Sequence, residues 1–308
     1  MRRFPGILIA LFSLFAPSVS HALSSDTRLL SLVSPSALIV AGMDSPPPKE
    51  LPGSFVLMTH SNRMDLNDVL ALIGADSTLS IHHAVFVAKN DIGGYLNEHS
   101  LLMSGHFDQA RIYKSAVESG ARLIQYRGLP ILVIQPFARE RGEMDDVRWL
   151  AVLGSDVLLF GWIPSVREEL DRYLAHDAPD SVFAGKLAHL RRDDETWTMV
   201  WTPTRNPEIE GVLTALDPRL GELAEHADAF LFGIRYHRQV EFEYEALKAS
   251  GTAEGAIPES AMQSFVDMRK GSALLPRQNP TDNSIMAHGM VKIPVAEFSK
   301  WLEKVSTD

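Results

Sequence analysis

The clearest alternation of polar and apolar positions lies between residues 240 and 246. Apolar side chains occupy the even positions there, and glutamates occupy the odd ones. Such alternation predicts an antiparallel strand with one face toward a core and the other toward water. A second apolar segment, 230–236, comes just before it, so the two together predict a β-hairpin. The three glutamates are interpreted as a solvated face of that hairpin.

Shorter apolar runs predict the other strands, and caps and periodicity predict the helices. The predicted strands are 37–43, 55–59, 84–88, 101–104, 122–126, 131–135, 149–153, 157–161, 197–201 and 285–293. The predicted helices are 66–73 with Asp65 as its cap, 109–119 with Asp108 as its cap, 164–174, 209–216, 258–270 and a C-terminal helix after Pro294. Arg127-Gly128 and Gly154-Ser155 separate neighbouring strands, and the second pair is predicted to be a two-residue hairpin turn.

The four strands between 122 and 161 predict a local β-meander that helices flank at both ends. The helix after Pro164 carries Val166, Leu170, Tyr173 and Leu174 on one side, which is an apolar stripe suited to packing on a sheet. We therefore expect an α+β fold, built of antiparallel sheet units with amphipathic helices packed on one face.

Two strand–proline–helix segments share a residue order. Residues 169–174 and 297–302 both run Glu, apolar, small polar, basic, aromatic, Leu. An internal duplication would give this similarity, and so would convergence of two amphipathic helices, and both interpretations stay open. The duplication interpretation predicts two α+β units, 23–190 and 191–308.

The N-terminus has the layout of a secretory signal peptide. Arg2 and Arg3 precede an apolar run at 6–15, and Ser20-His21-Ala22 places small residues at a cleavage site. We predict a signal peptide at 1–22, cleaved after Ala22, and a periplasmic or secreted bacterial protein. No second apolar run reaches about 18 residues, so we expect no integral membrane segment in the mature chain.

The composition and motifs of the chain argue against several classes of partner and catalytic chemistry. The 308 residues carry a formal net charge of −10 and no cysteine. An acidic protein repels phosphate backbones, so we expect no nucleic-acid partner. Without cysteine there are no disulfides, thiol nucleophiles or iron–sulfur clusters. The motifs G-x-S-x-G, G-x-G-x-x-G and the Walker sequence do not occur, and no cofactor is expected.

Two groups of residues are candidates for a site. His60, His82, His106 and Asp108 offer imidazole and carboxylate ligands for zinc or manganese, although eleven scattered histidines give such crowding by chance. Arg235, His237 and Arg238 form a cationic hairpin tip that could engage an anionic partner, and an ordinary charged turn is the alternative. A metal site would make the chain a periplasmic metal-assisted hydrolase.

The segment Leu32–Met43 has the sequence LVSPSALIVAGM. It resembles the mature start of a group of uncharacterised exported bacterial proteins of similar length. That resemblance implies export and carries over no site residue, because the group has no established activity. Our preferred hypothesis is an exported protein that binds an envelope protein or an apolar small ligand. A metal-assisted hydrolase is one alternative, and an envelope assembly module that uses exposed strand edges is the other.

Overall fold

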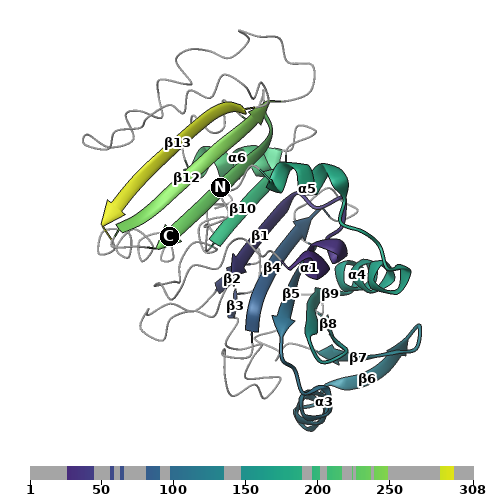
Figure 1. The fold of residues 1–308 in the computed structure, drawn as a ribbon. Coiled ribbons are helices and arrows are strands. Elements are labelled where there is room, and N and C mark those ends of the chain that lie inside the picture. Colours follow the sequence, from purple (N-terminus) through teal and green to yellow (C-terminus); the bar gives the residue numbers. More distant parts are fainter. Residues whose placement is uncertain are drawn as a thin grey trace. The chain divides into compact units, whose positions relative to one another are not determined.

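Figure 1 shows the fold of the chain in a computed structural model. The structure describes residues 26–44, 56–58, 63–65, 81–90, 98–134, 147–188, 196–201, 207–216, 224, 227–236, 239–248 and 285–294. Its helices are α1 (Thr27–Leu32), α3 (Gln109–Glu118), α4 (Ile163–Ala175), α5 (Ser181–Leu187) and α6 (Pro207–Leu216). Its strands are β1 (Ile39–Asp44), β2 (Val56–Met58), β3 (Arg63–Asp65), β4 (Ile81–Lys89), β5 (Glu98–Gly105), β6 (Arg122–Tyr126), β7 (Leu129–Ile134), β8 (Arg148–Leu153), β9 (Val157–Trp162), β10 (Thr196–Trp201), β11 (Ala227–Tyr236), β12 (Gln239–Lys248) and β13 (Ile285–Pro294).

Antiparallel strands with a few helices confirm the predicted α+β class. The chain divides into two compact units. We call them the 24–184 unit, which comprises Ser24–Pro47 and Met64–Ala184, and the 185–308 unit, which comprises Gly185–Asp308 with Met1–Leu23 and Pro48–Arg63. No helix in the described ranges is long and apolar enough to cross a bilayer.

In the 24–184 unit the strands follow the order β1-β4-β5-β9-β8-β7-β6, and each pair of neighbours is antiparallel. Strands β6 to β9 are consecutive in sequence and in space, which confirms the meander. The turn prediction was wrong, however. Tyr126 pairs with Leu129, so Arg127-Gly128 is the two-residue turn, with φ of 49° and 86°. Leu153 pairs with Val157, so the second turn has three residues.

Helix α4 covers part of this sheet. Its first turn holds Pro164, where the missing N–H removes no helical hydrogen bond. Of the predicted apolar stripe, Val166 and Leu170 are fully buried, whereas Tyr173 and Leu174 are half-buried. The helix packs against β5, β8 and β9, and it also contacts α1. The short helix α1 was not predicted, because six residues are too few for a helical period to show.

Helix α3 confirms its predicted caps and joins the sheet through side chains. Asp108 accepts a hydrogen bond from the Arg111 N–H, and Gly120 follows the helix with a φ of 98°. The ladder between β7 and β8 stops short of Pro130, because proline has no N–H to donate. Tyr113 fills that gap: its hydroxyl donates to the Pro130 carbonyl (2.7 Å) and accepts from the Val152 N–H (3.2 Å).

In the 185–308 unit β10, β11, β12 and β13 form antiparallel neighbours. The β11–β12 pairing confirms the predicted hairpin. The expected wet face was wrong, because Glu243 and Glu245 are buried, at 5% and 4% exposure. Arg235, itself 1% exposed, lies 3.4 Å from Glu243 (Nη1 to Oε2). An adjacent cation offsets the cost of removing a carboxylate from water.

Several predicted features lie outside the described residues. They are the signal peptide 1–22 and the helices expected at 66–73, at 258–270 and after Pro294. The second copy of the repeated hexamer, 297–302, is also outside them. The duplication, and the two domains drawn from it, therefore remain predictions.

Candidate functional site

A group of polar side chains lies beneath and beside α4. We call it the α4 polar cluster; its members are Ser34, Lys89, Glu98, Ser100, Glu168 and Glu169. The Lys89 Nζ lies 2.5 Å from Glu168 Oε2 and 3.3 Å from Glu98 Oε2. Only 12% of the Lys89 side chain is exposed. The cluster thus ties α4 to β4 and β5 through a cation that two carboxylates share.

Glu169 is the most deeply buried carboxyl group of the cluster. It accepts a hydrogen bond from the Ser100 hydroxyl of β5, and both residues are almost fully buried. Burial raises the pKa of Glu169 to about 8, against the opposing effects of the Ser100 hydrogen bond and the Lys89 charge. Glu169 is therefore mostly protonated at neutral pH. Its second oxygen, Oε2, has no hydrogen-bond partner among the described residues.

Gly161 allows the close approach of β9 and β5 at this point. It pairs with Ser100 across the two strands. A Cβ on Gly161 would lie 2.5 Å from the His99 carbonyl oxygen and 2.6 Å from the Ser100 Cα. Both are backbone atoms, so neither could move aside without a shift of the strand.

The Ser100–Glu169 pair, a serine that donates to a carboxyl group, is an arrangement that nucleophilic catalysis also uses. Here the pair is closed off from water, and its contact is between a helix and a sheet.

An open groove of about 500 Å³ runs along the outer side of α4. Its lining residues are Arg127, Pro164, Arg167, Glu168, Asp171, Arg172, Ala175 and Asp177. Arg127 pairs with Asp171 at 3.2 Å, and Arg172 pairs with Asp177 at 3.4 Å. The lining carries three basic and three acidic side chains, so the groove favours neither anions nor cations.

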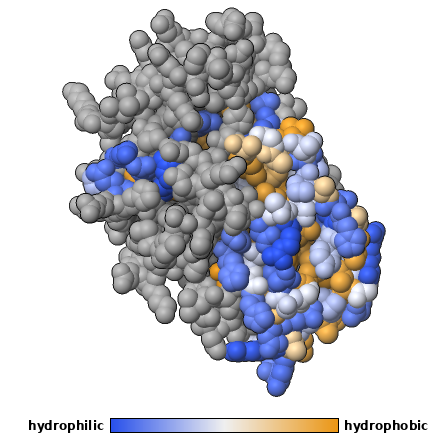
Figure 2. Space-filling view, viewed as in Figure 1, coloured by the Kyte–Doolittle hydropathy of each residue, from blue (hydrophilic) through white to orange (hydrophobic). Residues whose placement is uncertain are grey.

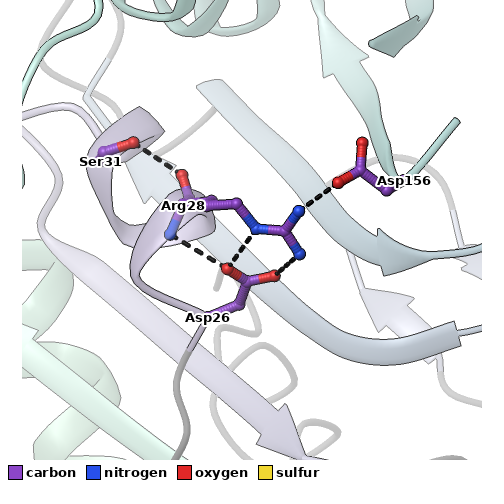
Figure 3. A network of polar contacts seen from close by, with 4 residues as sticks. All are labelled: Asp26, Arg28, Ser31 and Asp156. Carbon is purple, nitrogen blue, oxygen red and sulfur yellow. Dashed lines mark hydrogen bonds and ion pairs between the residues drawn. The ribbon is translucent and has the colours of Figure 1, made fainter. Parts of the chain in front are cut away.

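A second polar network fixes the start of the described chain (Figure 3). The Asp26 carboxylate caps α1 by accepting from the Arg28 N–H, and it also pairs with the Arg28 guanidinium, 2.7 Å from Nη2 to Oδ2. Burial opposes ionisation of Asp26, but the Arg28 hydrogen bonds outweigh it and lower the pKa of that carboxyl group. Arg28 also pairs with Asp156 in the β8–β9 turn. The network thus joins α1 to the meander.

The predicted metal ligands are only partly within the described residues. His82 lies in β4 at a register shift, where Ile81 pairs with Gly105, so His82 and His106 belong to the same end of the sheet. The Asp108 carboxylate is engaged as the α3 cap. Among the described residues no three His, Asp or Glu side chains come together to hold a metal ion. His60 lies outside that part of the chain, so the four-residue site remains a prediction.

The predicted cationic tip is also only partly described. Arg235 lies in β11 and is buried. Its Nη2 is 2.9 Å from Glu241 Oε2, and Glu243 also contacts it. Arg235 therefore pairs with carboxylates within the hairpin and presents no charge to a partner. His237 and Arg238 fall outside the described residues, so their part in the tip is untested.

The sequence did not reveal that β6 would be an edge strand. β7 is the only described strand that pairs with β6. The exposed side chains of β6 include Arg122, Gln125 and Leu123, of which the last is 51% exposed. Helix α3, which contacts β6, adds Val117 at 46% exposure. Figure 2 shows that the visible face of this unit is mainly hydrophilic, with small hydrophobic patches between.

Comparison with known proteins gave little. No protein-family model matches the chain. No curated protein matches it either. The crystal structure of TP0453 in crystal form I superposes with a TM-score of 0.47 at 9% sequence identity, over 91% of this chain and 97% of that chain. A likeness at that level carries no argument about function.

Proposed function

We propose that this chain is an exported bacterial protein that acts by binding an envelope protein at the open edge of β6. The observation that carries the proposal is the combination of an unpaired strand edge with exposed apolar side chains. In the described part of the 24–184 unit, β6 has a neighbour on one side only, and Leu123 is about half exposed. Exposed strand edges are sites where proteins accept a partner's main chain.

Export is the other half of the proposal. The basic and apolar segments before Ala22 support it, and so does the resemblance of residues 32–43 to exported bacterial proteins. N-terminal sequencing of protein recovered from a periplasmic extract tests it. We expect a mature chain that starts at Leu23. Recovery from the cytosol with the initiator Met1 retained would contradict export.

Of the two ligand classes expected from the sequence, a protein partner fits this geometry better than an apolar small molecule. The α4 groove is open and bordered by six charged side chains, and an apolar molecule that covered them would remove them from water at a cost in free energy. The β6 edge instead offers main-chain groups together with apolar side chains from two elements. A partner protein can satisfy both at once.

Site-specific photo-cross-linking in living cells tests the binding site. A benzophenone amino acid replaces Leu123 in one variant and Val182 of α5 in a matched control. The two positions are similarly exposed, at 51% and 54%. We expect a discrete adduct with another envelope protein from position 123 and none from position 182. No adduct from 123, or equal adducts from both positions, would contradict the proposal.

A further inference from the structure

The β6–β7 register identifies which backbone groups β6 leaves unused. A two-residue turn joins the strands, so Tyr126 and Leu129 form the hydrogen-bonded pair that closes it. Hydrogen-bonded and non-hydrogen-bonded pairs alternate along an antiparallel ladder. Ile124 therefore bonds to β7, whereas Leu123 and Gln125 direct their N–H and C=O groups away from it. The outer edge of β6 thus presents two sets of main-chain donors and acceptors.

We propose that this edge takes up an extended, acidic segment of the partner protein as an added β-strand. The inference rests on the proposed function and specifies its chemistry. Main-chain hydrogen bonds to Leu123 and Gln125 supply the pairing, and the exposed Leu123 side chain contacts an apolar residue of the incoming strand. In strand addition of this kind, main-chain bonds give affinity and side chains give specificity.

Charge determines which segment fits. Arg122 is exposed at the start of β6 and forms no ion pair with another described residue. Arg127, in the turn at the other end, is 61% exposed although it pairs with Asp171. The whole chain carries a net charge of −10, so a strand with arginine at both ends is a local exception. Acidic side chains on the incoming strand would complement both ends.

A second copy of this chain fits the edge less well. A two-fold antiparallel pairing of two β6 edges would centre on Ile124, because Leu123 of each copy would then bond to Gln125 of the other. That register places Arg122 of one copy opposite Tyr126 of the other, next to Arg127. At each end of the pairing, Arg122 of one copy would thus lie close to Arg127 of the other, and like charges on facing strands are destabilising. An acidic segment from another protein avoids this repulsion.

Two synthetic peptides of about eight residues provide the test, one alternating valine with glutamate and the other alternating valine with lysine. Their binding to the mature protein is measured by fluorescence anisotropy at low ionic strength. We expect the glutamate peptide to bind at least about tenfold more tightly, a difference that corresponds to a few charge contacts. Equal binding of both peptides would overturn the inference.

Two substitutions test whether the peptide binds at the outer edge of β6. Gln125→Pro removes one outward N–H but no bond to β7, and proline is tolerated on strand edges, so unfolding in urea should be unchanged. We expect it to weaken binding about tenfold. Arg122→Glu should weaken binding of the glutamate peptide and strengthen that of the lysine peptide, whereas Lys114→Glu, the same charge change on α3, should do neither. Unchanged binding by folded Gln125→Pro would contradict strand addition.

The outcomes separate the inference from the proposed function. An adduct at position 123 in cells, without peptide binding in vitro, would refute the acidic strand and leave the binding function intact. A wild-type dimer in sedimentation velocity that Gln125→Pro abolishes would replace the acidic partner with a second copy. Absence of both adduct and peptide binding would refute both proposals.

Discussion

The Tyr113 hydroxyl occupies the place in the β7–β8 ladder that Pro130 leaves open. It lies 2.7 Å from the Pro130 carbonyl and 3.2 Å from the Val152 nitrogen. The Gln109 side chain donates to the Val152 carbonyl at 2.9 Å, so side chains of α3 replace both of the ladder hydrogen bonds that Val152 would otherwise make. A strand that contains proline is thus kept in the sheet by a helix. The same helix borders the open edge that we propose as the binding site.

Replacing Tyr113 with phenylalanine tests this relationship. The change removes one hydroxyl and leaves the Val152 N–H and the Pro130 carbonyl without that partner. We expect the free energy of unfolding to fall by about 1–3 kcal/mol, measured by urea denaturation. Tyr173→Phe on α4 is the control, since the Tyr173 hydroxyl makes no hydrogen bond to a described residue. Equal effects of the two substitutions would count against the bridging role of Tyr113.

Glu169 should make stability depend on pH. Its pKa is raised to about 8 in the folded protein, above a usual value of 4.5. Between these values the folded state holds a proton that the unfolded state releases, so the free energy of unfolding falls as pH rises. The slope is at most about 1.4 kcal/mol per pH unit, and it ends above pH 8.

Urea unfolding between pH 5 and pH 9 measures that slope. Glu169→Gln should flatten it, because the amide is neutral throughout and its oxygen can still accept from Ser100. The control is Glu118→Gln, an exposed position on α3 whose side chain is 66% exposed. That variant should keep the wild-type slope. A slope unaffected by Glu169→Gln would show that the group is ionised in the folded protein.

Gly161 and Gly211 should respond in opposite ways to alanine. At Gly161 the new Cβ would meet backbone atoms of His99 and Ser100 at 2.5–2.6 Å, so β9 must shift. We expect a loss of about 1–3 kcal/mol or more. At Gly211 in α6 the new Cβ would meet no described atom within 4 Å apart from its chain neighbours and its own helix backbone, and alanine favours helix, which predicts a gain of about 0.5–1 kcal/mol. Thermal unfolding of both variants measures whether each change lowers or raises stability. A Gly161→Ala variant as stable as the wild type would contradict the close approach of β9 and β5.

Arg235 and Lys292 both contact Glu241, but they differ in burial. Arg235 is 1% exposed and Lys292 is 56% exposed. Arg235→Met would remove the cation that lies 3.4 Å from the buried Glu243, and we expect a loss of about 3–5 kcal/mol. Lys292→Met should cost less than about 1 kcal/mol. Denaturation in urea distinguishes them; similar small losses would mean that Arg235 does not neutralise the buried carboxylates.

The sequence predicted local features of the fold better than the site. Alternation and caps located the strands and α3, because these signals act within a few residues. The burial of Glu243 was missed, since alternation separates two faces of a strand but does not say what covers each. Glu169 did leave a signal: it stands three residues after Val166, inside the apolar stripe of α4. The sequence held no signal for the edge position of β6, because strand order depends on contacts between distant segments.

Amide hydrogen exchange along β6, followed residue by residue in the free mature protein, tests the open edge most directly. The β6–β7 register predicts slow exchange at Ile124 and Tyr126, whose N–H groups bond to β7, and fast exchange at Leu123 and Gln125. Addition of the valine–glutamate peptide should slow the latter two amides alone. Exchange at Leu123 and Gln125 as slow as at Ile124 in the free protein would mean that the edge is already occupied, and would contradict the proposed binding site.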